Sequence, residues 1–241
     1  MKAFWKMRVL SFYLCTTFVI VGFSVASVSV KKLGCQYGTI YGICKYFSNL
    51  FVQCAKYTCS LRYKVVGLEK LPNCPSVVLS NHQSFWENIF MQVIIPKHSW
   101  VVKEETKKIP LFGKAFIKSL DPITVDRKDV GSVVKIIKKG SEKIKKGLWV
   151  IIFPESTRVL PTQKSSIKPS GVKLAMENNV PIVVLLHNAG LYWPKGFWVK
   201  KSGTIKVKIV HVIYPKDFVN KTVREVNDQV EQIMNNVKMS L

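Results

Sequence analysis

From residue 63 onward, short apolar runs alternate with segments whose apolar residues recur at helical spacing. The runs 75–80, 148–153 and 181–186 are largely apolar, which is typical of strands that are covered on both faces. A shorter stretch at 121–125 and the period-two alternation of 204–213 predict two further strands, the second nearer a sheet edge. The intervening helices are expected to begin near residue 84 and to cover residues 130–147, 170–178 and 222–237.

This order of elements predicts the fold class. Strands that alternate with helices form an α/β domain, in which a mostly parallel, mixed sheet is flanked by helices. The chain has 241 residues, which is enough for one sizeable core, and its 48% hydrophobic content excludes a wholly disordered protein. No internal repeat or low-complexity linker divides it. We therefore expect one α/β domain at residues 61–241.

The segment before this domain is the most apolar part of the chain. Residues 9–30 carry no charge over 22 positions, and about 20 apolar residues suffice to span a bilayer core. A cleaved signal peptide is the alternative, although residues 26–28 form a poor cleavage site. Residues 38–57 are interrupted by two lysines, which favours an interfacial amphipathic helix over a second span. Residues 1–60 are therefore expected to form N-terminal membrane-embedding helices.

The charge of the chain indicates an anionic partner. It has 37 basic and 14 acidic residues, a formal net charge of +23 and a pI near 9.9. Such a field favours a polyanionic surface, either nucleic acid or an anionic lipid membrane. Residues 1–68 contain nine basic residues and no acidic one, beside the apolar segment, so the membrane is the preferred partner. No recognisable nucleic-acid-binding module is present, and nucleic acid is not expected as a partner.

The cysteines do not indicate a metal site. All six lie in the first 75 residues, form no CxxC pair and have no histidine cluster nearby. Reduced thiols that pack among apolar side chains explain them, and no metal is expected.

The first segment with candidate chemistry is Asn81–Glu87, directly after a predicted buried strand. On a straight helix His82 and Glu87 would lie about 140° apart, so they meet only if His82 is in a loop and Glu87 in the first helical turn. The carboxylate would then orient the imidazole, whose other nitrogen would take a proton from a hydroxyl. The alternative is structural, because Ser84-x-x-Glu87 is also a capping box.

Three more segments follow predicted strands. Arg127 follows the strand at 121–125, although an Asp–Arg pair in a turn is the commoner arrangement. Residues 153–158 end a buried strand with a carboxylate, a hydroxyl and a guanidinium, and arginine binds phosphate through two parallel hydrogen bonds. An ordinary polar loop is the alternative there, and residues 180–186 are otherwise a core strand. Between the first two segments lie lysines 103, 107, 108, 114 and 118.

Taken in this order, the segments resemble the conserved blocks of the PlsC-type glycerolipid acyltransferases. Residues 81–87 are similar to the NHxxxxD block and residues 123–127 to the hydrophobic-x-x-DR block of that family. Residues 153–158 resemble FPEGTR, and residues 180–182 resemble the VPI block. The resemblance covers residues 62–215, and it favours the catalytic interpretation of the first block over the capping box.

Two residues depart from the family pattern. Glu87 stands where the family more often has aspartate, which lengthens the orienting arm by one methylene. Ser156 replaces the glycine of FPEGTR, which predicts that the backbone there does not need a conformation that only glycine tolerates.

The resemblance implies an activity and a role for each site residue. His82 would deprotonate the free sn-2 hydroxyl of lysophosphatidic acid, which attacks an acyl thioester, and Glu87 would hold the imidazole in the correct tautomer. The product would be phosphatidic acid for phospholipid synthesis, and the co-substrate acyl-CoA or acyl carrier protein, with no cofactor or metal. The residues expected to bind the acceptor phosphate or to shape its pocket are Arg158, Arg127, Lys103, Glu155 and Thr157.

Two alternatives and an orientation accompany this prediction. The first alternative is an acyltransferase that acts on glycerol 3-phosphate or another lysolipid. The second is a membrane-tethered basic binding module. Because acyl donors are cytoplasmic, the active site is expected on the cytoplasmic side of a bacterial inner membrane. Lys31 and Lys32 agree with the positive-inside rule, whereas Lys2, Lys6 and Arg8 oppose it. A helix pair that never reaches the far side removes this conflict and is the preferred arrangement.

Overall fold

The computed structural model of the protein describes residues 2–109, 112–126, 131–196, 198–199 and 201–238. Its strands are β1 (Leu61–Val66), β2 (Val77–Ser80), β3 (His98–Lys103), β4 (Ile123–Val125), β5 (Trp149–Ile152), β6 (Ile182–His187) and β7 (Gly203–Ile213). Its α-helices are α1 (Lys2–Lys32), α2 (Tyr37–Cys59), α3 (Trp86–Ile94), α4 (Phe112–Leu120), α5 (Ser132–Lys145), α6 (Ser170–Glu177) and α7 (Val223–Lys238).

Within the described residues, the strands form one seven-stranded sheet in the order β1-β7-β6-β2-β5-β3-β4. Neighbouring strands are parallel except β6 and β7, which run antiparallel. The predicted mostly parallel, mixed sheet is therefore confirmed. β2 lies between β5 and β6 and parallel to both, so the loops after these three strands meet at one edge of the sheet.

The hydrophobic pattern predicts most of these elements. The predicted strands appear as β2, β4, β5, β6 and β7, and the predicted helices as α3, α5, α6 and α7. β3 is not indicated by the pattern, because it opens with the polar pair His98 and Ser99, both of which are buried. The pattern does not indicate α4 either, which lies in the lysine-rich stretch between the first two candidate segments.

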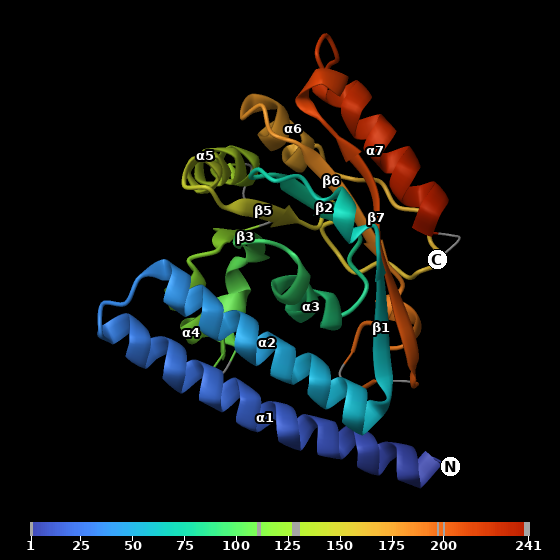
Figure 1. Cartoon of the computed structure of the whole chain (residues 1–241). Helices are drawn as coiled ribbons and strands as arrows, with labels where there is room; N and C mark the ends of the chain where they lie inside the picture. Colours follow the sequence, from blue (N-terminus) through green and yellow to red (C-terminus); the bar gives the residue numbers. More distant parts are fainter. Residues whose placement is uncertain (1, 110–111, 127–130, 197, 200, 239–241) are drawn as a thin grey trace.

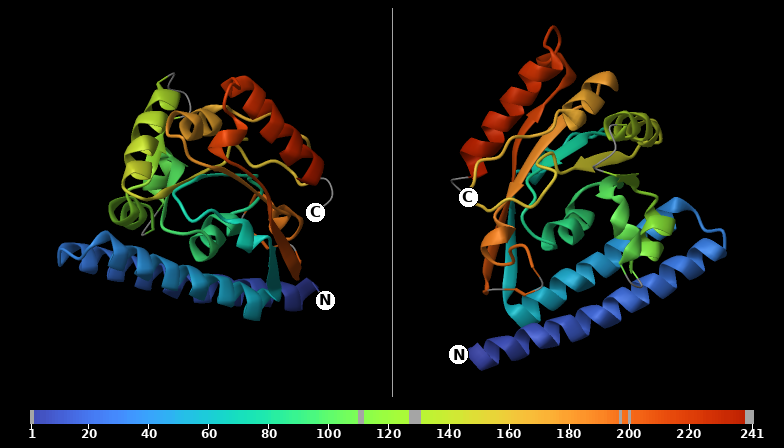
Figure 2. Two further views of the ribbon diagram at one scale, coloured as in Figure 1. Left: turned by 45° about the horizontal axis from the view of Figure 1, so that its top comes forward. Right: turned by 180° about the vertical axis from the view of Figure 1, so that it is seen from behind.

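Helices cover both faces of the sheet (Figure 2). α5, α6 and α7 lie on one face, whereas α3 and α4 lie on the other, together with the α1–α2 pair. The two cores follow from the alternation of side chains along the strands. Val77 and Leu79 of β2 pack in the cluster beneath α5–α7, and Val78 between them packs in the cluster that contains α3.

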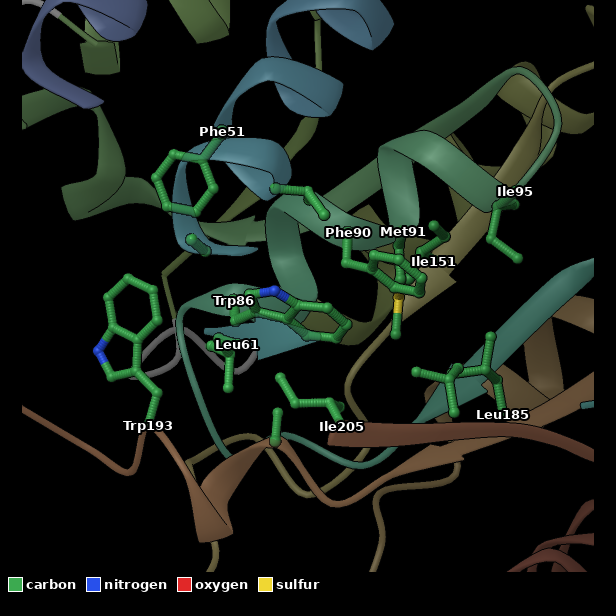
Figure 3. Packing of buried hydrophobic residues seen from close by; sticks show 14 of the residues in the cluster. Phe51, Leu61, Trp86, Phe90, Met91, Ile95, Ile151, Leu185, Trp193 and Ile205 are labelled. Carbon is green, nitrogen blue, oxygen red and sulfur yellow. The ribbon is translucent and has the colours of Figure 1, made fainter. Parts of the chain in front are cut away.

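α1 and α2 run antiparallel to each other along the outside of α3 and α4 (Figure 1). Their inner side chains belong to the same core as the α/β domain. Phe12 of α1 packs edge-on against Phe51 of α2, which stacks on Trp193 with ring centroids 6.2 Å apart. Figure 3 shows Phe51 and Trp193 beside Trp86 of α3. This shared core favours a retained helix over a cleaved signal peptide.

The outer face of α1 has no protein partner among the described residues. Ala3–Lys32 is the one described helix that is long and apolar enough to cross a membrane. The exposed apolar side chains on it, which we call the α1 stripe, are Phe4, Met7, Leu10, Leu14, Phe18, Val21 and Val25. α2 matches the amphipathic helix predicted for residues 38–57. The division of the chain at residues 60 and 61 stays a prediction, although α2 ends and β1 begins there.

Candidate active site

His82 and Glu87 face each other at the carboxyl end of β2. The strand ends at Ser80, and Glu87 lies in the first turn of α3, as the five-residue spacing requires. Nδ1 of His82 lies 2.8 Å from Oε1 of Glu87, so the imidazole N–H donates to the carboxylate. The Glu87 side chain is 1% exposed and that of His82 is 14% exposed, so the imidazole alone reaches solvent.

The same carboxylate also caps the start of α3. Oε1 of Glu87 accepts the backbone N–H of Gln83 at 2.9 Å and that of Ser84 at 2.8 Å. Capping and orientation of His82 are therefore combined in one side chain. Burial alone would raise the pKa of Glu87, but the two neighbouring histidines and the Ser84 N–H lower it below its ordinary value. Glu87 is thus ionised at neutral pH and can stabilise a protonated imidazole.

The loop that carries His82 is fixed to the end of β6. Nδ2 of Asn81 donates to the carbonyl of His187 at 2.8 Å, and the His187 N–H donates back to Oδ1 at 3.0 Å. Oε1 of Gln83 accepts the N–H of Gly190 at 3.1 Å. A Cβ added to Gly190 would lie 2.9 Å from Cβ of Gln83, so only glycine permits this approach. The backbone of the loop is thereby held on one side.

His187 acts in this loop as a neutral, structural side chain. Its Nε2 lies 2.9 Å from the carbonyl of Asn81 and donates to it, while Nδ1 accepts the N–H of Ala189 at 3.3 Å. Burial lowers the pKa of His187, which keeps the ring uncharged at neutral pH. The supporting roles of Asn81, Gln83 and His187 were not deduced from the sequence, since they depend on contacts across 106 or 107 residues.

Glu155 approaches the same loop from the end of β5. Its Oε2 accepts the backbone N–H of His82 at 2.8 Å, and its Oε1 accepts the hydroxyl of Ser165 at 2.6 Å and the ammonium of Lys238 at 2.7 Å. The carboxylate is buried beneath the His82 loop and does not line the cleft described below. The structure therefore places Glu155 behind the catalytic loop rather than in a pocket wall.

A cleft of about 400 Å³ opens beside His82. The His82 ring stacks on Phe153 with centroids 4.4 Å apart and planes inclined by 21°. Besides His82, the described residues that line the cleft include the basic side chains of Lys103, Arg158 and Lys195. Thr157 lines it as well, so the structure gathers three of the predicted substrate-binding residues around the candidate base. Lys195 was not predicted from the sequence.

An apolar pocket of about 60 Å³ adjoins this cleft between α1, α2, α3 and α4. The two spaces share Asn88, Ile89, Trp100 and Phe116 in their walls. The site thus combines cationic groups near His82 with an apolar extension beneath the N-terminal helices. This arrangement suits a substrate with a charged head and a hydrocarbon chain.

Ser156 adopts a backbone conformation that the sequence did not lead us to expect. Its φ angle is +61°, in the left-handed region that favours glycine. The family's glycine at this position would adopt it without strain. Serine adopts this conformation at an energetic cost, so the position favours glycine without requiring it.

Two predictions are not tested by the geometry. Arg127 lies in residues 127–130, outside the described residues. Among the residues that the structure describes, no three His, Cys, Asp or Glu side chains are grouped so as to hold a metal ion. That the reaction needs no metal or cofactor stays a prediction.

Comparison with known proteins agrees with this geometry. Residues 62–187 match the family model described as Acyltransferase. A 1-acyl-sn-glycerol-3-phosphate acyltransferase from Pseudomonas aeruginosa is 40% identical over 172 residues, which cover 71% of this chain and 66% of that protein. A protein of the same name from Helicobacter pylori is 27% identical over 177 residues, which cover 70% of this chain and 73% of that protein.

A solved structure shares the fold. The crystal structure of the 1-acyl-sn-glycerophosphate (LPA) acyltransferase PlsC from Thermotoga maritima superimposes with a TM-score of 0.79 at 23% identity, covering 97% of this chain and 94% of that one. The family match and the shared fold define an acyltransferase of the α/β class with N-terminal helices. The chain belongs to the acyltransferase family, which confirms the resemblance to the PlsC-type enzymes and favours an enzyme over a basic binding module.

Proposed function

We propose that the protein transfers an acyl chain from a thioester donor to the sn-2 hydroxyl of 1-acylglycerol 3-phosphate, giving phosphatidic acid. The observation that carries this proposal is the His82–Glu87 pair, which opens onto a cleft lined by lysine and arginine. The names of the relatives from Pseudomonas aeruginosa and Helicobacter pylori support the same acceptor. The chain matches 66% of the former relative's length and 44% of a Brassica napus relative's.

The proposed chemistry needs no enzyme nucleophile. Among the described residues, Nε2 of His82 has no hydrogen-bond partner, and it takes the proton of the acceptor hydroxyl while the oxygen attacks the thioester carbonyl carbon. The tetrahedral intermediate collapses with cleavage of the C–S bond. The leaving sulfur then receives the proton from His82, which returns to its neutral form. Glu87 fixes the tautomer throughout and stabilises the transient imidazolium.

The phosphate of the acceptor is proposed to bind to the cations in the cleft. Arg158 can grip two phosphate oxygens through its planar fork, and Lys103 adds a second positive charge in the same wall. Arg127 remains a proposed assistant on the basis of its motif. Thr157 offers a hydroxyl in the wall. We expect a phosphate held here to bring the free sn-2 hydroxyl of the acceptor toward His82.

The apolar pocket between the helices is proposed to accept a hydrocarbon chain. Its walls include Phe23 of α1 and Phe47 of α2, and it shares Trp100 and Phe116 with the wall of the cleft. A buried chain gains about 0.8 kcal/mol for each methylene removed from water. The carrier of the donor acyl group is proposed to be coenzyme A or acyl carrier protein, both of which are anionic and suit a chain of net charge +23.

The α1 stripe is proposed to lie in the cytoplasmic leaflet of a bacterial inner membrane. Its seven large apolar side chains are exposed on one helix, beside a shared core that ties α1 to the catalytic domain. A Lys6→Cys variant, in a chain without its native cysteines, tests this orientation. Labelling from the cytoplasmic side alone is the expected result, and labelling from the periplasm would show that α1 crosses the membrane.

The acceptor is tested with purified membranes that contain the protein. They are incubated with acyl-CoA and labelled 1-acylglycerol 3-phosphate, and in parallel with glycerol 3-phosphate or with a lysolipid that lacks a terminal phosphate. We expect phosphatidic acid from the first acceptor at the highest kcat/KM. Faster acylation of glycerol 3-phosphate or of the other lysolipid would assign the protein to that alternative, and a His82→Ala variant gives the background.

A further inference from the structure

Lys238, at the end of α7, is a buried lysine that faces the catalytic loop from behind. Its side chain is 1% exposed, and so is that of its partner Glu155, whose Oε1 lies 2.7 Å from the ammonium. Among the ion pairs of the described residues, no other has both side chains so fully buried. Lysine is rarely buried to this extent unless it is paired.

A buried ion pair of this kind is costly as a stabilising device. Removing two charges from water costs several kcal/mol per ion, and apolar residues of similar volume are often as stabilising or better. Stability alone therefore does not explain the pair, and a further hydrogen bond of Glu155 indicates its role. The other oxygen of Glu155 accepts the backbone N–H of His82 at 2.8 Å.

The three groups form a continuous connection from the last helix to the candidate base. Lys238 holds one carboxylate oxygen of Glu155, Ser165 donates its hydroxyl to the same oxygen at 2.6 Å, and the second oxygen holds the His82 backbone. On its other side, the carbonyl of His82 accepts the N–H of Val159 at 2.8 Å. The backbone of His82 is thus held through both its N–H group and its carbonyl oxygen.

We propose that Lys238 is a positioning residue for catalysis, which supplies the counter-charge that keeps the Glu155 carboxylate bound to the backbone of His82. The inference rests on the proposed function, because it takes His82 as the general base. Without Lys238, Glu155 is a buried carboxylate that lacks a positive partner, and it gains by turning toward water. The His82 N–H then loses its acceptor and the imidazole moves relative to the bound hydroxyl. Docking of α7 is thereby required for activity, although α7 contributes no group to the cleft among its described residues.

The test separates positioning from stability. In Lys238→Met the charge is removed at similar length, and kcat is expected to fall about 10-fold to 100-fold, while KM for the acceptor stays within about twofold. Adding Glu155→Gln restores neutrality and keeps an oxygen for the His82 N–H, so the double variant should recover to within about 10-fold of wild type. Arg224→Met is the matched control, because it breaks an exposed ion pair with Asp228 on the same helix and should leave kcat unchanged.

A second double variant keeps the proposal falsifiable where Lys238→Met does not fold. Glu155→Leu with Lys238→Met is also neutral and apolar, but it offers the His82 N–H no acceptor. It should have at least about 10-fold lower kcat than the Glu155→Gln double variant, at comparable thermal stability. Equal kcat in the two double variants, or wild-type kcat in folded Lys238→Met, would overturn the proposal. Each kcat is expressed relative to wild type, on whichever acceptor the wild-type protein acylates. The acceptor assay with wild type therefore tests the lysophosphatidic acid assignment separately.

Discussion

The strained backbone at Ser156 predicts that a glycine there stabilises the protein. The left-handed conformation costs a non-glycine residue roughly 1–2 kcal/mol, and Ser156 has φ +61° with no side-chain hydrogen bond among the described residues. Glycine removes this cost, but it adds about 0.5–1 kcal/mol of backbone entropy to the unfolded state. With the middle of each range, about 1.5 and about 0.75 kcal/mol, the net gain is about 0.75 kcal/mol for Ser156→Gly. For a chain of this length, that gain corresponds to a rise in Tm of about 1–4 °C.

The assay is thermal unfolding in detergent, with two controls from the chain itself. Ser156→Ala removes the hydroxyl but keeps Cβ, so it should leave the strain and the Tm nearly unchanged. Ser166→Gly introduces a glycine at an exposed position further along the same loop, where φ is not positive, and should lower stability by about 0.5–1 kcal/mol. If Ser156→Gly lowers Tm as Ser166→Gly does, the left-handed conformation stores no strain and the reasoning is refuted.

Two other predictions concern the acceptor and the pH dependence of stability. Arg158→Lys keeps the charge but loses the planar guanidinium, so KM for lysophosphatidic acid should rise at least about 10-fold in steady-state assays, or about 1.4 kcal/mol. Arg127→Lys should have a smaller effect. An unchanged KM in Arg158→Lys would remove Arg158 from the phosphate site. Burial lowers the pKa of His98 to about 4 from 6.5, so the unfolded state binds an extra proton between these values. The free energy of unfolding should therefore fall by up to about 3 kcal/mol as pH drops from 6.5 to 4. Measured by urea unfolding, it should depend less steeply on pH in His98→Gln than in wild type. An identical pH dependence in the two proteins would mean that His98 is protonated in the folded state.

The same histidine explains why one strand of the sheet could not be predicted from the sequence. β2, β5 and β6 are predictable because nearly every position in them is apolar and both faces of the sheet are covered. β3 begins with His98, whose Nδ1 lies 2.9 Å from the hydroxyl of Tyr41 on α2. The polar Nδ1 atom can be buried in a strand because such a partner satisfies it, and the partner is 57 residues away.

In the site, too, some features follow from the local sequence and others do not. The pairing of His82 with Glu87 follows from local spacing, because the loop and the first turn of a helix bring the two together. The position of Glu155 behind the loop does not, since it depends on Lys238, 83 residues further along the chain. The left-handed backbone of Ser156 is also beyond a sequence argument, because serine in itself does not indicate that conformation.

We infer that Glu87 is a catalytic partner of His82 and not merely a helix cap. The most direct test is kcat of Glu87→Gln on lysophosphatidic acid, measured beside its Tm. Glutamine keeps an oxygen for the N–H groups of Gln83 and Ser84, so the cap survives, but it lacks the charge that stabilises a protonated His82. We expect kcat to fall at least about 100-fold, toward the level of His82→Ala, with only a small shift in Tm, whereas Glu87→Asp keeps substantial activity. Turnover of Glu87→Gln at the wild-type rate would contradict this inference.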